Sequence, residues 1–127
     1  MADLLGQAVD WLNGRRAAYM ARTVLYGRGE ESVELAATLG STTFEVIDET
    51  GTSVEARATD FIIAADALVL AGQQVKPAPG DRIRLTSGAK VLVYEVMDLG
   101  GAGHWRPCDP AGRMLRIHAK QIDEEDA

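Results

Sequence analysis

The stretch from Pro77 to Trp105, PAPGDRIRLTSGAKVLVYEVMDLGGAGHW, decides the fold class of this chain. Two prolines and a Gly-Asp pair lie within positions 77–81 and end any regular structure before the alternating residues that follow. Apolar and polar residues then alternate, so that Ile83 and Leu85 share one side of a strand, and SGAK forms a turn. The returning segment places Leu92, Tyr94 and Val96 on one side. This pattern predicts an antiparallel β-hairpin.

The same period of two runs through most of the chain after Arg22. One predicted strand carries Val33, Leu35 and Ala37 on one face, and the last carries Leu115, Ile117 and Ala119 on one face. The run FIIA at 61–64 is typical of a strand buried on both faces. The Ala- and Leu-rich segment at 64–70 predicts a helical turn, and the loop at 100–113 is too rich in glycine and proline for regular structure.

The N-terminal segment has a different period. Leu5, Ala8, Leu12 and Tyr19 fall near helical spacing, which predicts a helix. We therefore divide the chain into a helix over 1–22, packed on its own domain or on a neighbouring subunit, a β-barrel domain over 23–122, and an acidic flexible tail over 123–127. A helix followed by about six or seven short strands predicts a mainly β protein, a small antiparallel β-barrel or sandwich with an N-terminal α-helix.

Composition limits the function. The chain has 127 residues, enough for one domain with its own core. Cys108 is the only cysteine, so an intramolecular disulfide is impossible. The first residues resemble neither a signal peptide nor a membrane span, which favours an intracellular or particle-associated soluble protein. A formal charge of −6, from 19 acids and 13 bases, argues against general nucleic-acid binding. The same acidity would suit a lining that surrounds moving DNA without gripping it.

The sequence shows no catalytic or metal-binding constellation. His104, Cys108, Asp109 and His118 do not form the two close ligand pairs of a structural zinc site. Cys108 with His104 is a conceivable nucleophile and base, but the pair lies in a proline-flanked loop. The glycine-rich segments LGGAG and TSGAK lack the lysine and hydroxyl of a phosphate loop. We therefore predict no enzyme activity, no cofactor and no metal.

Direct nucleic-acid recognition has little support. A basic stripe could be formed by Arg82, Arg84, Arg106, Arg113, Arg116 and Lys120, with Tyr94 and Trp105 available for stacking. Arginine and lysine on the outward faces of strands are ordinary, and aromatic residues make up 6% of the chain, too few for a stacking platform. Sequence-specific binding is therefore not predicted.

Several short motifs follow one another in a distinctive order over the last seventy or so residues. They are Asp60-Phe61, the turn and strand Pro77, Gly80, Asp81 and Ile83, then Tyr94-Glu95-Val96, the loop residue Trp105, and Leu115 to His118. In this order the segment resembles small head–tail joining proteins of tailed phages and prophages, also called head-completion, connector or stopper proteins.

This resemblance implies a β-barrel subunit of an oligomeric ring, six-fold or twelve-fold, at the head–tail interface of a virion or phage-like particle, with host cytoplasm as its location before assembly. Such a ring would extend the DNA channel, help to retain packaged DNA and dock the tail. Its partners would be further copies, portal or adaptor proteins, tail proteins, and double-stranded DNA that passes without sequence-specific binding. Two alternatives stay open: a tail-terminator-type ring protein, and a free-standing β-barrel module that binds a peptide or nucleic acid.

Loops and strand edges are the natural contact sites of such a ring. The candidate channel or partner-docking residues are Asp48, Glu49, Thr50, Gly51, Thr52, Gly100, Gly101, His104, Trp105 and Arg106. The candidate subunit-interface residues are Trp11, Tyr19, Arg82, Arg84 and Arg116. Trp105 either anchors an interface or folds back over the end of its own barrel.

Overall fold

The computed structural model describes residues 21–99 and 103–126. The elements in chain order are β1 (Arg22–Arg28), β2 (Glu31–Ile47), β3 (Ser53–Ala64), the 3-10 turn η1 (Ala65–Ala67), β4 (Val69–Leu70), β5 (Gln73–Gln74), β6 (Arg82–Ser87), β7 (Lys90–Val96), β8 (Trp105–Pro107) and β9 (Met114–Asp126). No α-helix occurs in these two ranges. The helix predicted over residues 1–22 lies outside them, except for its end, where Arg22 begins β1 instead.

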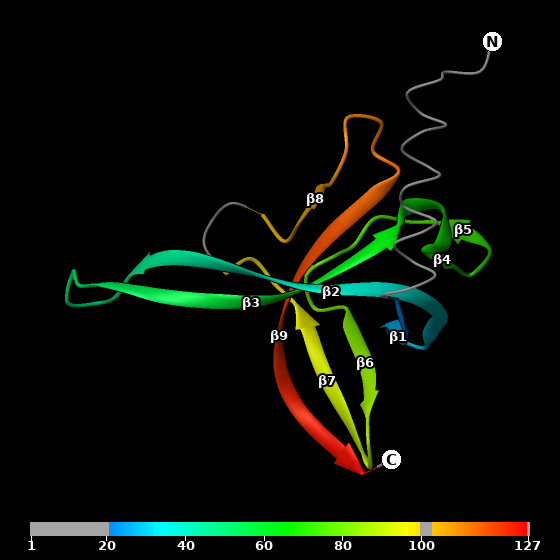
Figure 1. Ribbon diagram of the computed structural model, residues 1–127, viewed down its shortest axis with the longest axis horizontal. Helices are drawn as coiled ribbons and strands as arrows, with labels where there is room; N and C mark the ends of the chain where they lie inside the picture. Colours follow the sequence, from blue (N-terminus) through cyan, green and yellow to red (C-terminus); the bar gives the residue numbers. More distant parts are fainter. Residues whose placement is uncertain (1–20, 100–102, 127) are drawn as a thin grey trace.

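Antiparallel pairing organises the chain into one large sheet, as the alternating sequence predicts. Seven strands follow the order β3-β2-β1-β6-β7-β9-β8, and β4 pairs with β5 in a separate small sheet. A further pairing, from Thr59↔Ala119 to Ala64↔Met114, joins β3 to β9. This contact brings the two sides of the sheet together, so the sheet partly closes on itself (Figure 1).

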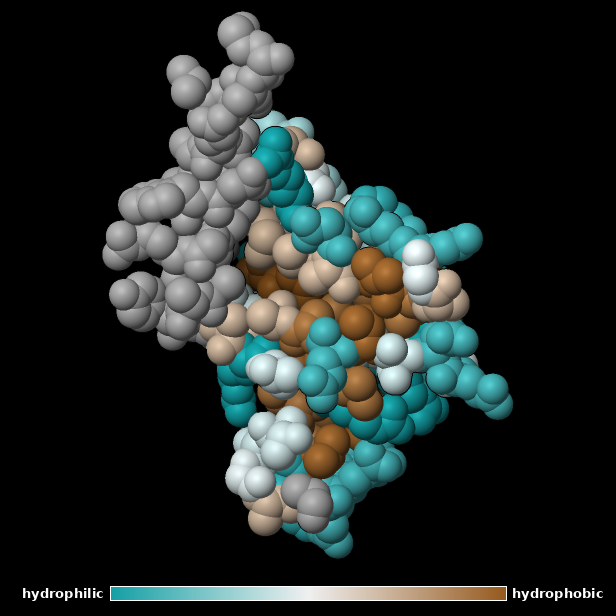
Figure 2. Space-filling model, turned by 90° about the vertical axis from the view of Figure 1, so that its right-hand side faces the viewer, coloured by the Kyte–Doolittle hydropathy of each residue, from teal (hydrophilic) through white to brown (hydrophobic). Residues whose placement is uncertain are grey.

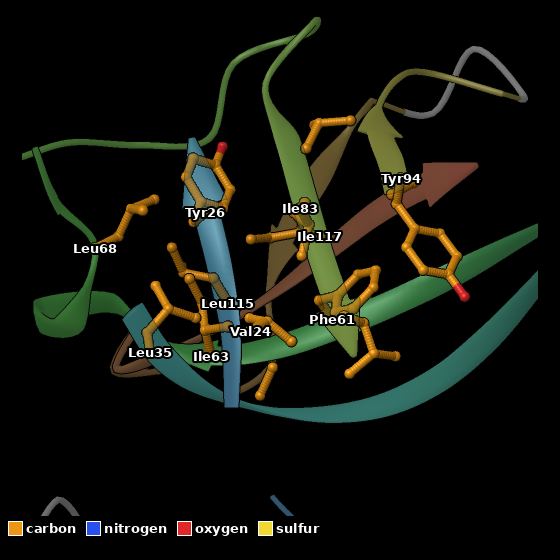
Figure 3. Close-up of a cluster of buried hydrophobic side chains, with 14 of the residues drawn as sticks. Val24, Tyr26, Leu35, Phe61, Ile63, Leu68, Ile83, Tyr94, Leu115 and Ile117 are labelled. Atoms are coloured by element: carbon orange, nitrogen blue, oxygen red, sulfur yellow. The ribbon is translucent and has the colours of Figure 1, made fainter. Parts of the chain in front are cut away.

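The core fills the inside of the partly closed sheet. Inward residues occur at every second position, as the period of a strand requires. Figure 3 shows buried side chains from β1, β3, β6 and β9 converging there. They include Val24, Tyr26, Leu35, Phe61, Ile63, Ile83, Tyr94, Leu115 and Ile117. The predicted faces Leu35/Ala37, Ile83/Leu85 and Leu115/Ile117/Ala119 are all confirmed as buried.

The segment after β3 closes one end of the core. The predicted helical turn is η1, and Leu68 and Leu70 behind it are buried in the core cluster. Figure 2 looks at this end of the molecule and shows hydrophobic residues gathered in the middle of the face, with polar residues around them. Val69 remains 37% exposed.

Two segments are more regular than the sequence predicts. The loop at 100–113 contains β8, which pairs with β9 from Trp105↔Ile117 to Pro107↔Leu115. The predicted flexible tail is a strand up to Asp126, because β7 supplies backbone partners for it. Its acids also find bases: Lys90 Nζ lies 2.6 Å from Asp126 Oδ1, and Arg84 Nε lies 3.1 Å from Glu125 Oε1. Ion pairs to bases on β6 and β7 therefore accompany the strand pairing of a segment that its acidic sequence predicts to be flexible.

Strand β2 is continuous through Gly40. A Cβ atom at position 40 would lie 2.9 Å from Arg116 Nη2. Glycine at this position therefore lets the Arg116 side chain pack close to the β2 backbone and does not form a turn.

Candidate assembly surface

The β2–β3 hairpin is much longer than the sheet that holds it. β1 pairs with β2 only as far as Ala37, and β9 pairs with β3 only from Thr59 onward. Between these limits the two strands pair only with each other among the described residues, ending at Ile47↔Ser53. We call residues 43–57, the part that projects from the body in Figure 1, the outer arm. It has the free edges and length of a contact element.

The two faces of the outer arm differ. Residues directly opposite each other share a face, so Phe44 with Ala56 and Thr42 with Ala58 lie on one side. The other side carries Glu45 opposite Glu55, with Arg57 opposite Thr43. Val54 on the first face is 43% exposed. The arm therefore has one mostly apolar face and one charged face, and no other described strand pairs with either edge.

The tip of the arm is a self-contained turn. Asp48 Oδ1 accepts hydrogen bonds from the backbone N–H groups of Thr50 and Thr52, each at 2.9 Å, and from Thr50 Oγ1 at 2.7 Å. The Thr50 hydroxyl, and then these amides, hold the pKa of Asp48 below its usual value. Gly51 has a φ of +82°, which suits glycine. The predicted residues 48–52 thus form one exposed, ordered and acidic loop.

The root of the arm is held by a buried carboxylate. Asp60 is fully buried and accepts hydrogen bonds from Thr42 Oγ1, from Arg116 Nε at 2.6 Å, and from His118 Nδ1 at 2.7 Å. These donors lie on β2 and β9, while Asp60 lies on β3. Burial disfavours the charged carboxylate, but the donors Thr42, His118 and Arg116 outweigh it and lower the pKa of Asp60. The network therefore joins three strands where the arm leaves the sheet.

A second buried carboxylate explains the Pro-x-x-Gly-Asp motif. Asp81 accepts hydrogen bonds from the Tyr26 hydroxyl, from Arg28 Nε and Nη2 at 2.9 Å each, and from the amide of Ala78 at 2.9 Å. Burial alone would raise the pKa of Asp81, but Arg28 and then Tyr26 lower it overall. This motif is therefore a structural clasp between β1 and the loop before β6, and none of its members lies on the arm.

The loop around β8 folds back on the body. His104 Nε2 lies 2.8 Å from the carbonyl oxygen of Pro77, and the His104 carbonyl accepts a bond from the amide of His118 at 2.8 Å. Trp105 is half-buried against the core cluster, and the Lys76 ammonium lies 5.5 Å from its ring centroid. Arg106 is exposed. Contacts within the chain therefore hold Trp105, while Arg106 stays on the surface.

The structure separates the predicted interface arginines. Arg82 is exposed and lies opposite Glu95, whereas Arg84 pairs with Glu125 and Arg116 with the buried Asp60. The interface predictions at Trp11 and Tyr19, and the loop predictions at Gly100 and Gly101, lie outside the described residues. Among the predicted residues that the structure describes, Asp48 to Thr52 form one continuous exposed segment.

Sequence analysis missed the two buried carboxylates. The sequence TDFII does contain a signal of a buried acid, because it places an aspartate directly beside an apolar run. A buried acid needs charged or polar partners. His118, placed on a strand face by its alternation, is in fact one of those partners. Across residues 21–99 and 103–126 we find no group of three or more side chains able to hold a metal. No helix in the same ranges is long and apolar enough to cross a membrane.

Comparison with known proteins matches the chain to a protein family. A family model described as phage head-tail joining protein matches residues 2–126. A search of curated proteins finds no match.

Proposed function

This chain belongs to the phage head-tail joining protein family, and on that premise we propose that it assembles into a ring that continues the DNA channel across the junction and retains packaged DNA. A protein of this family is a structural component of the head–tail interface and is not an enzyme. It interacts with head and tail proteins at the head–tail junction of the phage particle.

The observation that carries the proposal is the outer arm. It leaves a closed, well-packed body, exposes both of its faces, and ends in an ordered loop that carries Asp48 and Glu49. A two-stranded ribbon alone is marginally stable in water, so an arm of this length is expected to contact another chain. Copies arranged around an axis would bring these acidic tips together, and a negative lining would let DNA pass without adhesion.

A second surface suits the neighbouring head or tail protein. The loop around β8 is held firmly by His104 and Trp105, yet it leaves Arg106 exposed. A rigid loop with one free cation can contact a partner without losing much conformational entropy on binding. We assign this loop to docking and the arm to contacts around the ring.

Joining in vitro tests the proposal. Particles made without this chain should accumulate as heads and separate tails, and adding the purified protein should restore joined, infectious particles. Heads lacking it should also lose their DNA faster. Normal joining and normal DNA retention in its absence would contradict the function, and tails that assemble only to the wrong length would favour a tail terminator.

The acidic channel has its own test. We expect Glu49→Lys to leave joining intact and to slow DNA exit, because a cation at the tip would hold phosphates. Glu30→Lys, at the exposed β1–β2 turn, is the matched control, and DNA should leave particles that carry it at the normal rate. Equal rates of DNA exit for the two variants would show that the tip does not line the channel.

A further inference from the structure

The edges of the outer arm lack the features that usually keep strand edges apart. Natural sheets protect exposed edges with prolines, lysines or bulges. Residues 41–58, STTFEVIDETGTSVEARA, contain neither proline nor lysine. The register runs without a bulge from Thr38↔Ile62 to Ile47↔Ser53. Both edges are therefore regular, and neither proline, lysine nor a bulge blocks pairing along them.

The charged face of the arm is also unbalanced within one chain. Glu45 lies directly opposite Glu55, and like charges at such a position destabilise a hairpin. Arg57 lies on the same face but opposite Thr43. None of these three side chains forms an ion pair with another described residue. A nearby cation from outside the chain would correct the imbalance.

We propose that outer arms of neighbouring copies pair edge to edge, with the β3 edge of one copy hydrogen-bonded to the β2 edge of the next. An antiparallel register that places Arg57 opposite Glu45 of the next copy also places Glu55 opposite Ile47 of that copy. Arg57 then lies directly opposite Glu45 of the next copy, one of the two glutamates that repel each other in each free chain. The apolar faces, with Phe44 and Ala56, continue from copy to copy on the other side of the same sheet.

Head-to-tail pairing follows from the positions of the two edges. The β2 edge and the β3 edge lie on opposite sides of the arm, and each copy has one of each. Joining unlike edges satisfies both and repeats from copy to copy, and such a repeat closes into a ring when the rotation between copies divides a full turn. Pairing two β3 edges would instead give a dimer and leave both β2 edges free. This inference rests on the proposed ring and specifies which surface forms it.

Disulfide trapping between single-cysteine variants tests the pairing. The native Cys108, which is exposed, is first replaced by serine in the full-length chain. Ile47→Cys and Glu55→Cys chains are purified separately, mixed at the concentration where light scattering detects oligomers, and oxidised. Ile47→Cys mixed with Ser87→Cys, at the exposed β6–β7 turn, is the matched control.

We expect a mixed Ile47–Glu55 cross-link at least about tenfold above the control, because pairing raises the local thiol concentration far above that in solution. Each variant alone should give little dimer. A dimer from Glu55→Cys alone would show β3–β3 pairing and overturn the proposal. Rings seen by electron microscopy without the mixed cross-link would overturn the pairing and leave the proposed function standing. A chain that stays monomeric and uncross-linked at millimolar concentration would overturn the pairing, and failure to join heads and tails as well would overturn the function.

A charge exchange gives a second readout. Arg57→Glu should raise the concentration needed for oligomers by about tenfold or more, since three acids would then meet between copies. Adding Glu45→Arg to that variant should restore assembly. Lys120→Glu, which reverses an exposed cation on β9 away from the arm, should assemble normally. Loss of assembly in Lys120→Glu but not in Arg57→Glu would contradict edge pairing of the arms.

Discussion

The inner and outer halves of the β2–β3 hairpin share two strands and one continuous register, yet their surroundings are opposite. In the inner half, Phe61, Ile62 and Ile63 are all buried, and Phe61 and Ile63 belong to the core cluster together with Leu35 of β2. In the outer half, Ile47 is 73% exposed and no other described strand pairs with either edge. The two halves of one hairpin therefore have different roles. The inner half contributes to the core, and the outer half is available for contact with other chains.

Truncating an aromatic residue in each half gives the largest contrast. Phe61 is fully buried with its ring 5.0 Å from that of Tyr94, so Phe61→Ala should lower the free energy of unfolding by about 3–5 kcal/mol. Phe44, half-buried on the arm and 5.2 Å from the His118 ring, should cost clearly less on truncation. Urea unfolding of both variants measures the difference. Equal losses would mean that the arm belongs to the folding core.

The second prediction concerns Asp60, which lies at the boundary between the two halves. Asp60→Asn removes the charge that Arg116 and His118 share and should cost roughly 2–4 kcal/mol. Asp81→Asn is the matched control, since it removes a similar buried charge from the clasp. Only Asp60→Asn should speed amide hydrogen exchange over residues 53–58. Faster exchange there in both variants would show that the Asp60 network does not position the arm.

Low pH should destabilise the body of the protein through the same two carboxylates, Asp60 and Asp81. Because the pKa values of Asp60 and Asp81 are lowered in the folded chain, the folded state binds fewer protons than the unfolded state. Their contribution is fully present above the unfolded pKa of about 4 and is lost as pH falls through the folded values. Unfolding midpoints should therefore be flat from neutral pH to about pH 5 and fall below about pH 4. A shallower fall in Asp60→Asn is expected, and an unchanged acid profile in that variant would contradict the assignment.

The tip should show the smallest effect. Asp48→Ala removes the acceptor for the Thr50 and Thr52 amides, but the loop is exposed, so the unfolding midpoint should not change measurably. Hydrogen exchange at those two amides should become faster. A large drop in the midpoint would show that the outer arm is coupled to the core.

The sequence predicts the body of the sheet better than the outer arm, for physical reasons. Alternation at Ile83/Leu85 and Leu115/Ile117 reflects burial on one face, and the run at 61–64 reflects burial on two, so local pattern is enough there. The closure of β3 on β9 joins residues far apart in sequence, and no local pattern encodes it. The partners of Asp60 and Asp81 are likewise distant. The sequence predicts residues 48–52 as a candidate contact loop, but the projection of the arm depends on where neighbouring strands stop.

The most direct test of the account is a chain without the outer arm. Residues 43–57 are replaced by an Asn-Gly turn that joins Thr42 to Ala58, which keeps the Thr42–Asp60 hydrogen bond at the root. Light scattering then measures the oligomer mass, and urea unfolding measures stability. We expect the shortened chain to fold, to lose no more stability than Phe44→Ala does, to stay monomeric and not to join heads to tails. A shortened chain that still forms oligomers of the original subunit number would contradict it.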